Sequence, residues 1–150
     1  MKITDIFYPS LIKMNLNASS KEEVINELAE LIDENGFLFD KDHYIKEVIK
    51  REALGSTGVG MGVAIPHGKS RFVKEACVAF GKSQKGINFG SSDGSLAHLI
   101  FLIAVPEDTD NQHLKILATL SRMLIHQEFR EDLLQTNSLE EVMQVINSHK

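Results

Sequence analysis

The most reactive arrangement of residues in this chain surrounds the histidine at position 67. It directly follows Pro66 and stands behind a stretch with glycines at positions 55, 58, 60 and 62. Glycine lets backbone amides approach a ligand closely, and a proline holds the residue before it extended. We therefore expect a ligand-facing loop, then a short apolar strand whose end exposes the imidazole to a bulky reactant. Such an imidazole suits a nucleophile or a ligand-binding group.

The glycines add weight to His67. A histidine at a strand end is, by itself, commonly a hydrogen-bonded structural residue. Four glycines fall within the eight residues from 55 to 62, and in a packed element each would cost roughly 0.5–1 kcal/mol relative to alanine. The stretch is thus more typical of a surface that faces a ligand than of a core.

The elements before His67 follow from hydrophobic periodicity. Apolar and polar residues alternate over positions 12–16, which predicts a half-buried strand. Capping signals and apolar residues at helical spacing then predict two helices, over 20–36 and 40–55. Arg51 falls in the last turn of the second helix, beside the glycine-rich stretch.

Three further strands are predicted after the glycines, over positions 63–65, 76–80 and 98–105. The last is an almost continuous apolar run, typical of a central strand covered on both faces. Between the last two strands, positions 81–95 are rich in Gly, Ser and Asp and show no regular period. We expect this segment to be an exposed, mobile loop.

Three helices are predicted after Pro106. Asp108 or Asp110 can cap the first, which places His113 in its first turn; a short helix over 128–135 and a C-terminal helix opened by Ser138 follow. The predicted fold is α/β, of mixed α+β character: a three-layer α/β/α sandwich with a small mixed sheet and the element order β-α-α-β-β-β-α-α-α. We expect residues 1–150 to form one domain.

Composition narrows the function classes. The 150 residues are 43% hydrophobic and 25% charged, as in an ordinary globular protein. With 16 basic against 21 acidic residues and a net charge of −5, the chain has no general attraction to nucleic acid. It has no apolar run near the roughly 20 residues that a membrane-spanning helix needs, so we expect a cytoplasmic protein without direct membrane insertion.

The other candidate reactive groups give weaker evidence of a functional site. Cys77 is the only cysteine and lies in an apolar run, so we expect a buried, inert thiol and neither a disulfide nor a zinc cluster. The remaining histidines stand in no motif and at no metal-binding spacing: His43, His98, His126 and His149. No Gly-x-Ser-x-Gly hydrolase motif is present. We expect neither a metal nor a cofactor.

Two motifs carry a resemblance to a known family. Glu52 is followed by Val-Gly-Met-Gly-Val-Ala-Ile-Pro-His-Gly over 59–68, and Asn-Gln-His-Leu occupies 111–114. Both resemble the signatures of enzyme IIA domains of the fructose/mannitol class (type 2) of the bacterial sugar phosphotransferase system (PTS), and the likeness extends over the whole chain in length and element order.

The resemblance implies a phosphoryl carrier. His67 would accept a phosphoryl group from phospho-HPr and pass it to a cysteine of enzyme IIB, while Arg51 and His113 would stabilise the group. A neutral imidazole, with a reference pKa of about 6.5, has a nitrogen free to attack phosphorus. The glycine-loop amides, Ser56 and Thr57 are weaker candidates for phosphoryl contacts. A basic cluster at positions 69, 71 and 74 could steer a phosphorylated partner or could simply be solvated.

Three functions stay open. Segments 86–94 and 98–101 look most like the fructose-type branch, which favours a role in sugar uptake. The nitrogen-related branch carries the same histidine but uses its phosphorylation state to control other proteins. The third function is an interaction domain without transfer, as in the cytoplasmic domain of anion exchangers, which resembles this fold; the intact set of His67, Arg51 and His113 speaks against it.

Overall fold

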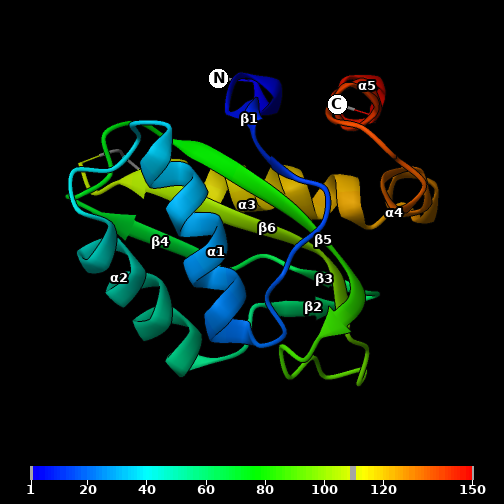
Figure 1. The fold of residues 1–150 in the computed structure, drawn as a ribbon, viewed down its shortest axis with the longest axis horizontal. Coiled ribbons are helices and arrows are strands. Elements are labelled where there is room, and N and C mark those ends of the chain that lie inside the picture. The colour runs from blue at the N-terminus through cyan, green and yellow to red at the C-terminus, as the bar shows by residue number, and fades with distance from the viewer. Residues whose placement is uncertain (1, 109–110, 150) are drawn as a thin grey trace.

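The computed structural model describes residues 2–108 and 111–149 and has three layers, with a mixed sheet between two sets of helices (Figure 1). A 3-10 turn, η1 (Ile3–Asp5), precedes the sheet. The strands are β1 (Phe7–Lys13), β2 (Gly58–Gly60), β3 (Val63–Ala64), β4 (His67–Ser70), β5 (Cys77–Ile87) and β6 (Ala97–Pro106). The helices are α1 (Lys21–Glu34), α2 (Lys41–Leu54), α3 (Gln112–Leu124), α4 (Gln127–Leu134) and α5 (Leu139–His149).

The sheet is organised around the antiparallel pair β5 and β6. β1 lies parallel to β5 at one edge, and on the other side β3 and β4 both lie parallel to β6. Ala64 aligns with Ile100 and His67 with Ile103, so β3 and β4 form one interrupted line along β6. Pro66 causes the interruption because it has no N–H to donate, while its carbonyl accepts from the Ile103 amide at 3.0 Å.

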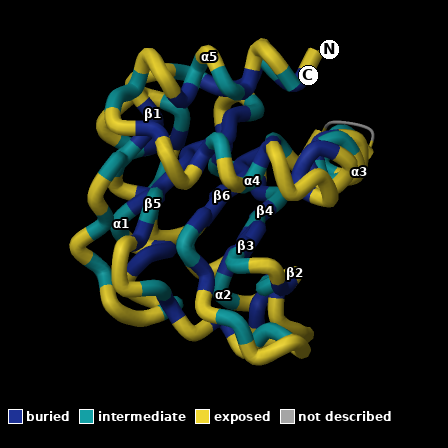
Figure 2. Tube along the Cα trace, turned by 90° about the vertical axis from the view of Figure 1, so that its right-hand side faces the viewer, coloured by how far each residue is buried: buried dark blue, intermediate teal, exposed yellow. Residues whose placement is uncertain are grey.

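Helices cover both faces of the sheet, as the buried segments in the middle of Figure 2 show. α1 and α2 pack on one face and α3, α4 and α5 on the other, each over its own apolar cluster. Successive residues of β5 alternate between the clusters: Cys77 and Ala79 face α1 and α2, whereas Val78 and Phe80 face the opposite layer. The predicted fold class is thus confirmed, with two more strands than expected.

Most predicted helix starts are also confirmed. Ser20, Asp40 and Ser138 each accept a hydrogen bond from the backbone N–H three residues ahead, at 3.1–3.2 Å. These bonds satisfy N–H groups that have no partner within the helix. Among the described residues, no helix combines the length and apolar character needed to cross a bilayer.

The start of α3 differs from the prediction. Its N-cap residue is Asn111, whose φ of 53° lies in the left-handed region and whose side chain makes no capping bond. Asparagine tolerates that conformation better than most residues. Asp108 therefore does not cap α3, and Asp110 lies outside the described residues. His113 does fall in the first turn, as predicted.

β1 begins earlier than predicted and ends at Lys13 rather than at position 16. Pro9 lies inside it, which is tolerated because β1 is an edge strand with only β5 as its neighbour. Its buried side chains include Leu11 and Ile12, so burial at adjacent positions replaces a simple alternation.

β5 also corrects the prediction of an exposed, mobile loop over 81–95. Its strand continues to Ile87, paired with β6, and both Ile87 and Phe89 are fully buried. Gly81 lets the Leu16 side chain pack closely on this strand, because a Cβ there would lie 2.7 Å from it. Long-range pairing with an apolar strand therefore outweighs the polar local composition.

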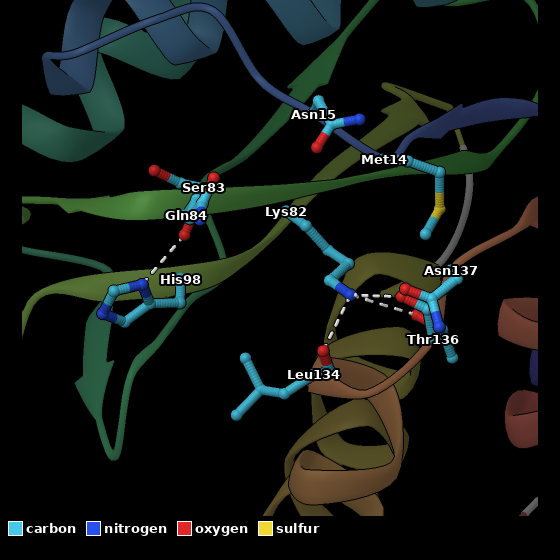
Figure 3. A pocket seen from close by; sticks show the side chains of 9 residues that line it. All are labelled: Met14, Asn15, Lys82, Ser83, Gln84, His98, Leu134, Thr136 and Asn137. Carbon is cyan, nitrogen blue, oxygen red and sulfur yellow. Dashed lines mark hydrogen bonds between the residues drawn. The ribbon is translucent and has the colours of Figure 1, made fainter.

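The same part of β5 borders a polar pocket of about 410 Å³ next to the loop between α4 and α5 (Figure 3). Lys82 Nζ donates to the carbonyl oxygens of Leu134 and Thr136 at 2.9 and 2.7 Å, and its distance to the Thr136 hydroxyl is 3.3 Å. The Nδ1 atom of His98 lies 2.8 Å from the Ser83 carbonyl oxygen. We refer to this as the Lys82 pocket.

Candidate active site

The glycine-rich stretch forms a β-hairpin of β2 and β3, whose tip packs on the loop before β6. The Met61 amide donates to the Asp93 carboxylate at 2.9 Å and the Gly62 amide to Ser95 Oγ at 3.2 Å. Gly60 has a φ of 85°, and a Cβ there would lie 2.6 Å from an Asp93 oxygen. These glycines allow tight packing of two chain segments, and no residue of 55–62 lines the pocket that contains His67.

His67 is the first residue of β4 and is half-buried. Its Nδ1 atom lies 2.9 Å from the carbonyl oxygen of Ile65. Because a carbonyl oxygen can only accept, Nδ1 carries the proton and the lone pair remains on Nε2. Burial lowers the pKa of His67 below its usual value, and the nearby Arg51 cation acts in the same direction. The imidazole is therefore neutral at pH 7, as a nitrogen nucleophile must be.

Gly68 brings α2 against the strand that carries His67. A Cβ at this glycine would lie 2.8 Å from the Val48 side chain and 3.1 Å from the Tyr44 ring, both of which belong to α2. The buried Tyr44 hydroxyl donates to the Ile103 carbonyl of β6 at 2.9 Å, which fixes the helix on the sheet. This close contact determines where the last turn of α2 lies relative to His67.

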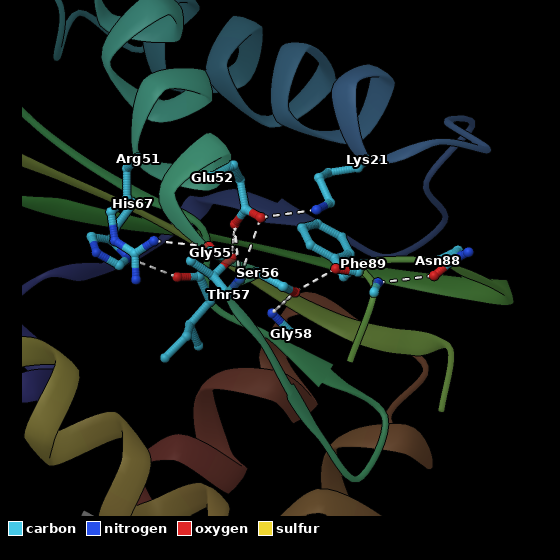
Figure 4. A network of polar contacts seen from close by, with 12 residues as sticks. Lys21, Arg51, Glu52, Gly55, Ser56, Thr57, Gly58, His67, Asn88 and Phe89 are labelled. Carbon is cyan, nitrogen blue, oxygen red and sulfur yellow. Dashed lines mark hydrogen bonds and ion pairs between the residues drawn. The ribbon is translucent and has the colours of Figure 1, made fainter. Parts of the chain in front are cut away.

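Arg51 stands in that last turn, as predicted. Its Nη1 atom donates to the carbonyl oxygen of Gly55 at 2.9 Å (Figure 4). A guanidinium has five N–H donors in a planar fork, so this single bond leaves donors for an anion.

His113 reaches the same site from the opposite helical layer. Burial lowers its pKa, and the positive charge of Lys69 and the neighbouring His67 lower it further. Its Nδ1 atom is buried and has no hydrogen-bond partner among the described residues. An unpaired buried nitrogen is unusual in a folded protein.

One pocket of about 470 Å³ joins the three residues predicted from the sequence, His67, Arg51 and His113. Its full lining is Glu47, Lys50, Arg51, Leu54, His67, Gly68, Lys69, His113, Leu114 and Leu117. Three of these side chains are cationic and one is anionic, although the whole chain carries a net charge of −5. The pocket is therefore suited to an anion. We refer to it as the His67 pocket.

Two features of the His67 pocket were not predicted. Lys69 lies two residues after His67 on β4, so both side chains project from the same face of the strand and both line the pocket. The sequence showed a basic cluster here but gave no reason to favour Lys69 over Arg71 and Lys74, which do not line the pocket. Leu54 is 83% exposed at its edge, and an apolar side chain in that position suits contact with a protein.

The weaker candidates have other partners. The Ser56 hydroxyl donates to the carbonyl oxygen of Phe89, and the Thr57 hydroxyl donates to the Glu52 carboxylate. Thr57 is only 4% exposed. Both residues therefore shape the loop after α2 and do not face the pocket. Glu52, which receives one of these bonds, belongs to the motif but was given no role by the sequence.

Cys77 is buried in β5, as predicted. Burial, with a smaller effect from Glu75, raises the pKa of its thiol to about 12. The thiolate that a cysteine nucleophile needs is therefore not available at neutral pH. Across residues 2–108 and 111–149, no three His, Cys, Asp or Glu side chains gather in a metal-binding group.

A neutral histidine, an arginine and a second histidine around one cation-rich pocket are groups that phosphoryl transfer can use. The family described as "Phosphoenolpyruvate-dependent sugar phosphotransferase system, EIIA 2" matches residues 5–149. The chain belongs to this family, as the two sequence motifs indicated.

The relatives of this chain include fructose-specific PTS components and nitrogen regulatory proteins. The chain is 40% identical to the PTS system fructose-specific EIIABC component of Bacillus subtilis over 99% of its own length, but spans only 24% of that relative. It is 38% identical to the PTS system fructose-specific EIIA component of Haloferax volcanii, with 97% of each chain covered. A nitrogen regulatory protein of Bradyrhizobium diazoefficiens is 35% identical, with 97% of this chain and 95% of the relative covered.

The similar solved structures include a nitrogen regulatory protein and a mannitol-specific enzyme IIA. Nitrogen regulatory protein IIA-Ntr from Neisseria meningitidis superposes with a TM-score of 0.87 and 34% identity, covering 96% of this chain and 98% of the other. Enzyme IIAMtl from Escherichia coli, solved in complex with phosphorylated enzyme IIBMtl, superposes with a TM-score of 0.82 and 25% identity, covering 95% and 99%.

Proposed function

We propose that this chain is the phosphoryl carrier of a sugar phosphotransferase system, acting in the cytoplasm between phospho-HPr and an enzyme IIB. His67 is the acceptor, and Arg51 and His113 stabilise the transferred group. The observation that carries the proposal is the tautomer of His67: its Nδ1 proton is bound to the Ile65 carbonyl, so its Nε2 lone pair is free in a pocket with excess positive charge.

The transfer needs no group beyond the two proteins. The Nε2 lone pair attacks phosphorus, the new N–P bond forms, and the bond from phosphorus to the donor breaks with its electron pair returning to HPr. In the second step a cysteine thiolate of enzyme IIB attacks the same phosphorus, and the N–P electron pair returns to Nε2. Arg51 and His113 would hold the equatorial oxygens through both steps.

One surface would serve both partners in turn. The His67 pocket opens between Leu54 on α2 and Leu114 on α3, both exposed at its edge. HPr and enzyme IIB would each cover these leucines and place their reactive group over His67. Sequential transfer requires such overlapping docking, because a single histidine faces each partner in turn.

Phosphorylation of His67→Ala tests the proposal. We expect the wild-type chain to gain an acid-labile, base-stable phosphohistidine from phosphoenolpyruvate, enzyme I and HPr, and the variant to gain none. His98→Ala is the matched control, since its imidazole is also held through Nδ1 by a backbone carbonyl but lines the Lys82 pocket. Labelling of His67→Ala at the wild-type rate would overturn the assignment.

Sugar uptake of the fructose type is the physiological role we propose. The fructose-specific relatives, at 40% and 38% identity, support it. The alternative is a regulatory EIIA whose phosphorylation state controls other proteins, supported by the nitrogen regulatory relative at 35% and by the IIA-Ntr structure.

A panel of enzyme IIB proteins separates the two roles. The phosphorylated chain is mixed with fructose-type and mannitol-type enzyme IIB, and the label on each cysteine is followed over time. Rapid transfer to a fructose-type IIB supports uptake. A chain that retains its phosphoryl group in the presence of every IIB supports the regulatory role.

A further inference from the structure

Glu52 is a buried carboxylate directly beside the candidate active site. It stands in the last turn of α2, next to Arg51 in sequence, and is 8% exposed. A buried carboxylate is costly unless its oxygens are paired. Here the Thr57 amide donates to both oxygens at 3.2 and 3.3 Å, the Thr57 hydroxyl donates to Oε1, and Lys21 Nζ lies 3.0 Å from Oε2.

These bonds close the loop after α2. Glu52 and Thr57 are its two ends, and Gly55 lies between them (Figure 4). The Gly55 carbonyl is the atom that accepts from Arg51 Nη1 at 2.9 Å. The position of the guanidinium therefore depends on the shape of a loop that Glu52 holds closed.

Lys21 supplies the positive charge that Glu52 needs. It comes from the first turn of α1, and its ammonium also lies 5.5 Å from the centre of the Phe89 ring. Arg51, the cation adjacent to Glu52 in sequence, is consequently not used to neutralise it. The two cations near the end of α2 thus have different roles: Lys21 pairs with Glu52, and Arg51 keeps N–H donors for the pocket.

We propose that the Glu52–Lys21 pair is a positioning device for phosphoryl transfer, which fixes Arg51 beside His67 and prevents Glu52 from binding the guanidinium. The inference rests on the proposed function. Glu52 and Lys21 do not line the His67 pocket, so they act through Arg51 and touch neither the phosphoryl group nor the attacking nitrogen.

Lys21→Met tests the division of charges. Without its ammonium partner, Glu52 would turn to Arg51, and phosphoryl transfer to His67 should slow about tenfold because the guanidinium is misplaced. Adding Glu52→Gln to this variant removes the competing charge and keeps an amide oxygen for Thr57. The double variant should therefore return to within about threefold of the wild-type rate, a non-additive rescue.

Lys13→Met is the matched control. Lys13 pairs with the partly buried Glu27 at the same distance of 3.0 Å, and Glu27 also accepts from backbone amides, those of Asn17 and Ala18. Both lysine variants lose one ammonium beside a hydrogen-bonded carboxylate, but only Lys21 pairs with the carboxylate that is next to Arg51 in sequence. Transfer as fast in Lys21→Met as in Lys13→Met, or a double variant as slow as Lys21→Met, would overturn the proposal.

An NMR titration of His67 separates this inference from the proposed function. The charged groups around its ring are Arg51 and Glu52 on α2, His113 on α3, and the other charged pocket residues Glu47, Lys50 and Lys69. Loss of Lys21 should raise the pKa of His67, because Glu52 then pairs with Arg51 and the guanidinium no longer lowers that pKa, and Glu52→Gln should reverse the rise. These shifts would support the positioning role even if wild-type protein accepted no phosphoryl group, and their absence would contradict it.

Discussion

The His67 pocket and the Lys82 pocket contain the same kinds of residue and differ in what those residues are bound to. Each holds an imidazole whose Nδ1 atom is bound to a backbone carbonyl, that of Ile65 for His67 and that of Ser83 for His98. The Lys82 ammonium contacts three oxygens at the end of α4, whereas Arg51 makes one bond to Gly55.

This difference shows what makes a histidine and a cation into a site. Lys82 has three N–H donors, and the three oxygens around it use them, so it stabilises the carbonyl end of α4 as a cation does at a helix C-terminus. Arg51 retains donors in a pocket with His113 and Lys69. A pair of polar residues in a cavity thus indicates a binding site only when some of its donors or acceptors are not used by the protein itself.

Arg51→Ala should give the largest effect that distinguishes the pockets. We expect phosphoryl transfer to His67 to slow about 100-fold, the usual loss when one donor to a transferring group is removed. Arg51→Lys should recover only part of the rate, because an ammonium cannot form the planar fork. Single-turnover transfer from phospho-HPr measures both. A rate for Arg51→Ala close to wild type would mean that Arg51, like Lys82, has only a structural role.

His113→Ala should slow the same step about tenfold, as expected for one hydrogen bond to a developing charge. The thermal midpoint should stay the same or rise, because the variant removes a buried nitrogen that has no partner among the described residues. A fall in stability with normal transfer would instead assign His113 a structural role.

The pH dependence of His67 sharpens the comparison further. Burial lowers the pKa of His67, so its neutral form should persist, and transfer should continue, as the pH falls below the reference value of about 6.5. As the pH falls, the imidazole of the unfolded chain protonates at a higher pH than that of the folded chain. The free energy of unfolding therefore decreases as the pH falls below about 6.5, and it is unaffected by His67 above that pH. A titration midpoint at or above 6.5 in 15N NMR would contradict this.

Lys82→Met should have the smallest effect on function and a measurable effect on stability. Phosphoryl transfer should be unchanged, whereas the free energy of unfolding should fall by about 1–3 kcal/mol as the oxygens of Leu134 and Thr136 lose a charged donor. Urea denaturation followed by circular dichroism measures the loss. A slower transfer in this variant would show that the two pockets are coupled.

The sequence predicted the layers and most helix starts because apolar periodicity and side-chain caps are local signals. It did not predict β2, β4 or the full length of β5. His67 to Ser70 has no alternation to mark it as a strand, and the polar half of β5 is held by pairing with β6. Strand pairing is a long-range property, which a local pattern cannot contain.

The candidate site, too, was predicted only in part. His67, Arg51 and His113 were found through motifs, and the structure adds that they line one pocket. The sequence could not show that the glycines also admit a neighbouring chain segment, here the one that carries Asp93. Glu52 belongs to the motif, but its proposed role could not be predicted from the motif because it depends on Lys21, 31 positions away in sequence.

The position of the His67 pocket between the two helical layers has a mechanical consequence. α2 packs through Val48 in one apolar cluster and α3 through Ile116 in the other, and the layers meet at this pocket without sharing a core. An anion bound to both Arg51 and His113 would link α2 to α3 and hold the two helical layers together at this pocket. Amide hydrogen exchange should then slow in α2 and α3 together, so that the dynamics of two helices report whether a single small group is present.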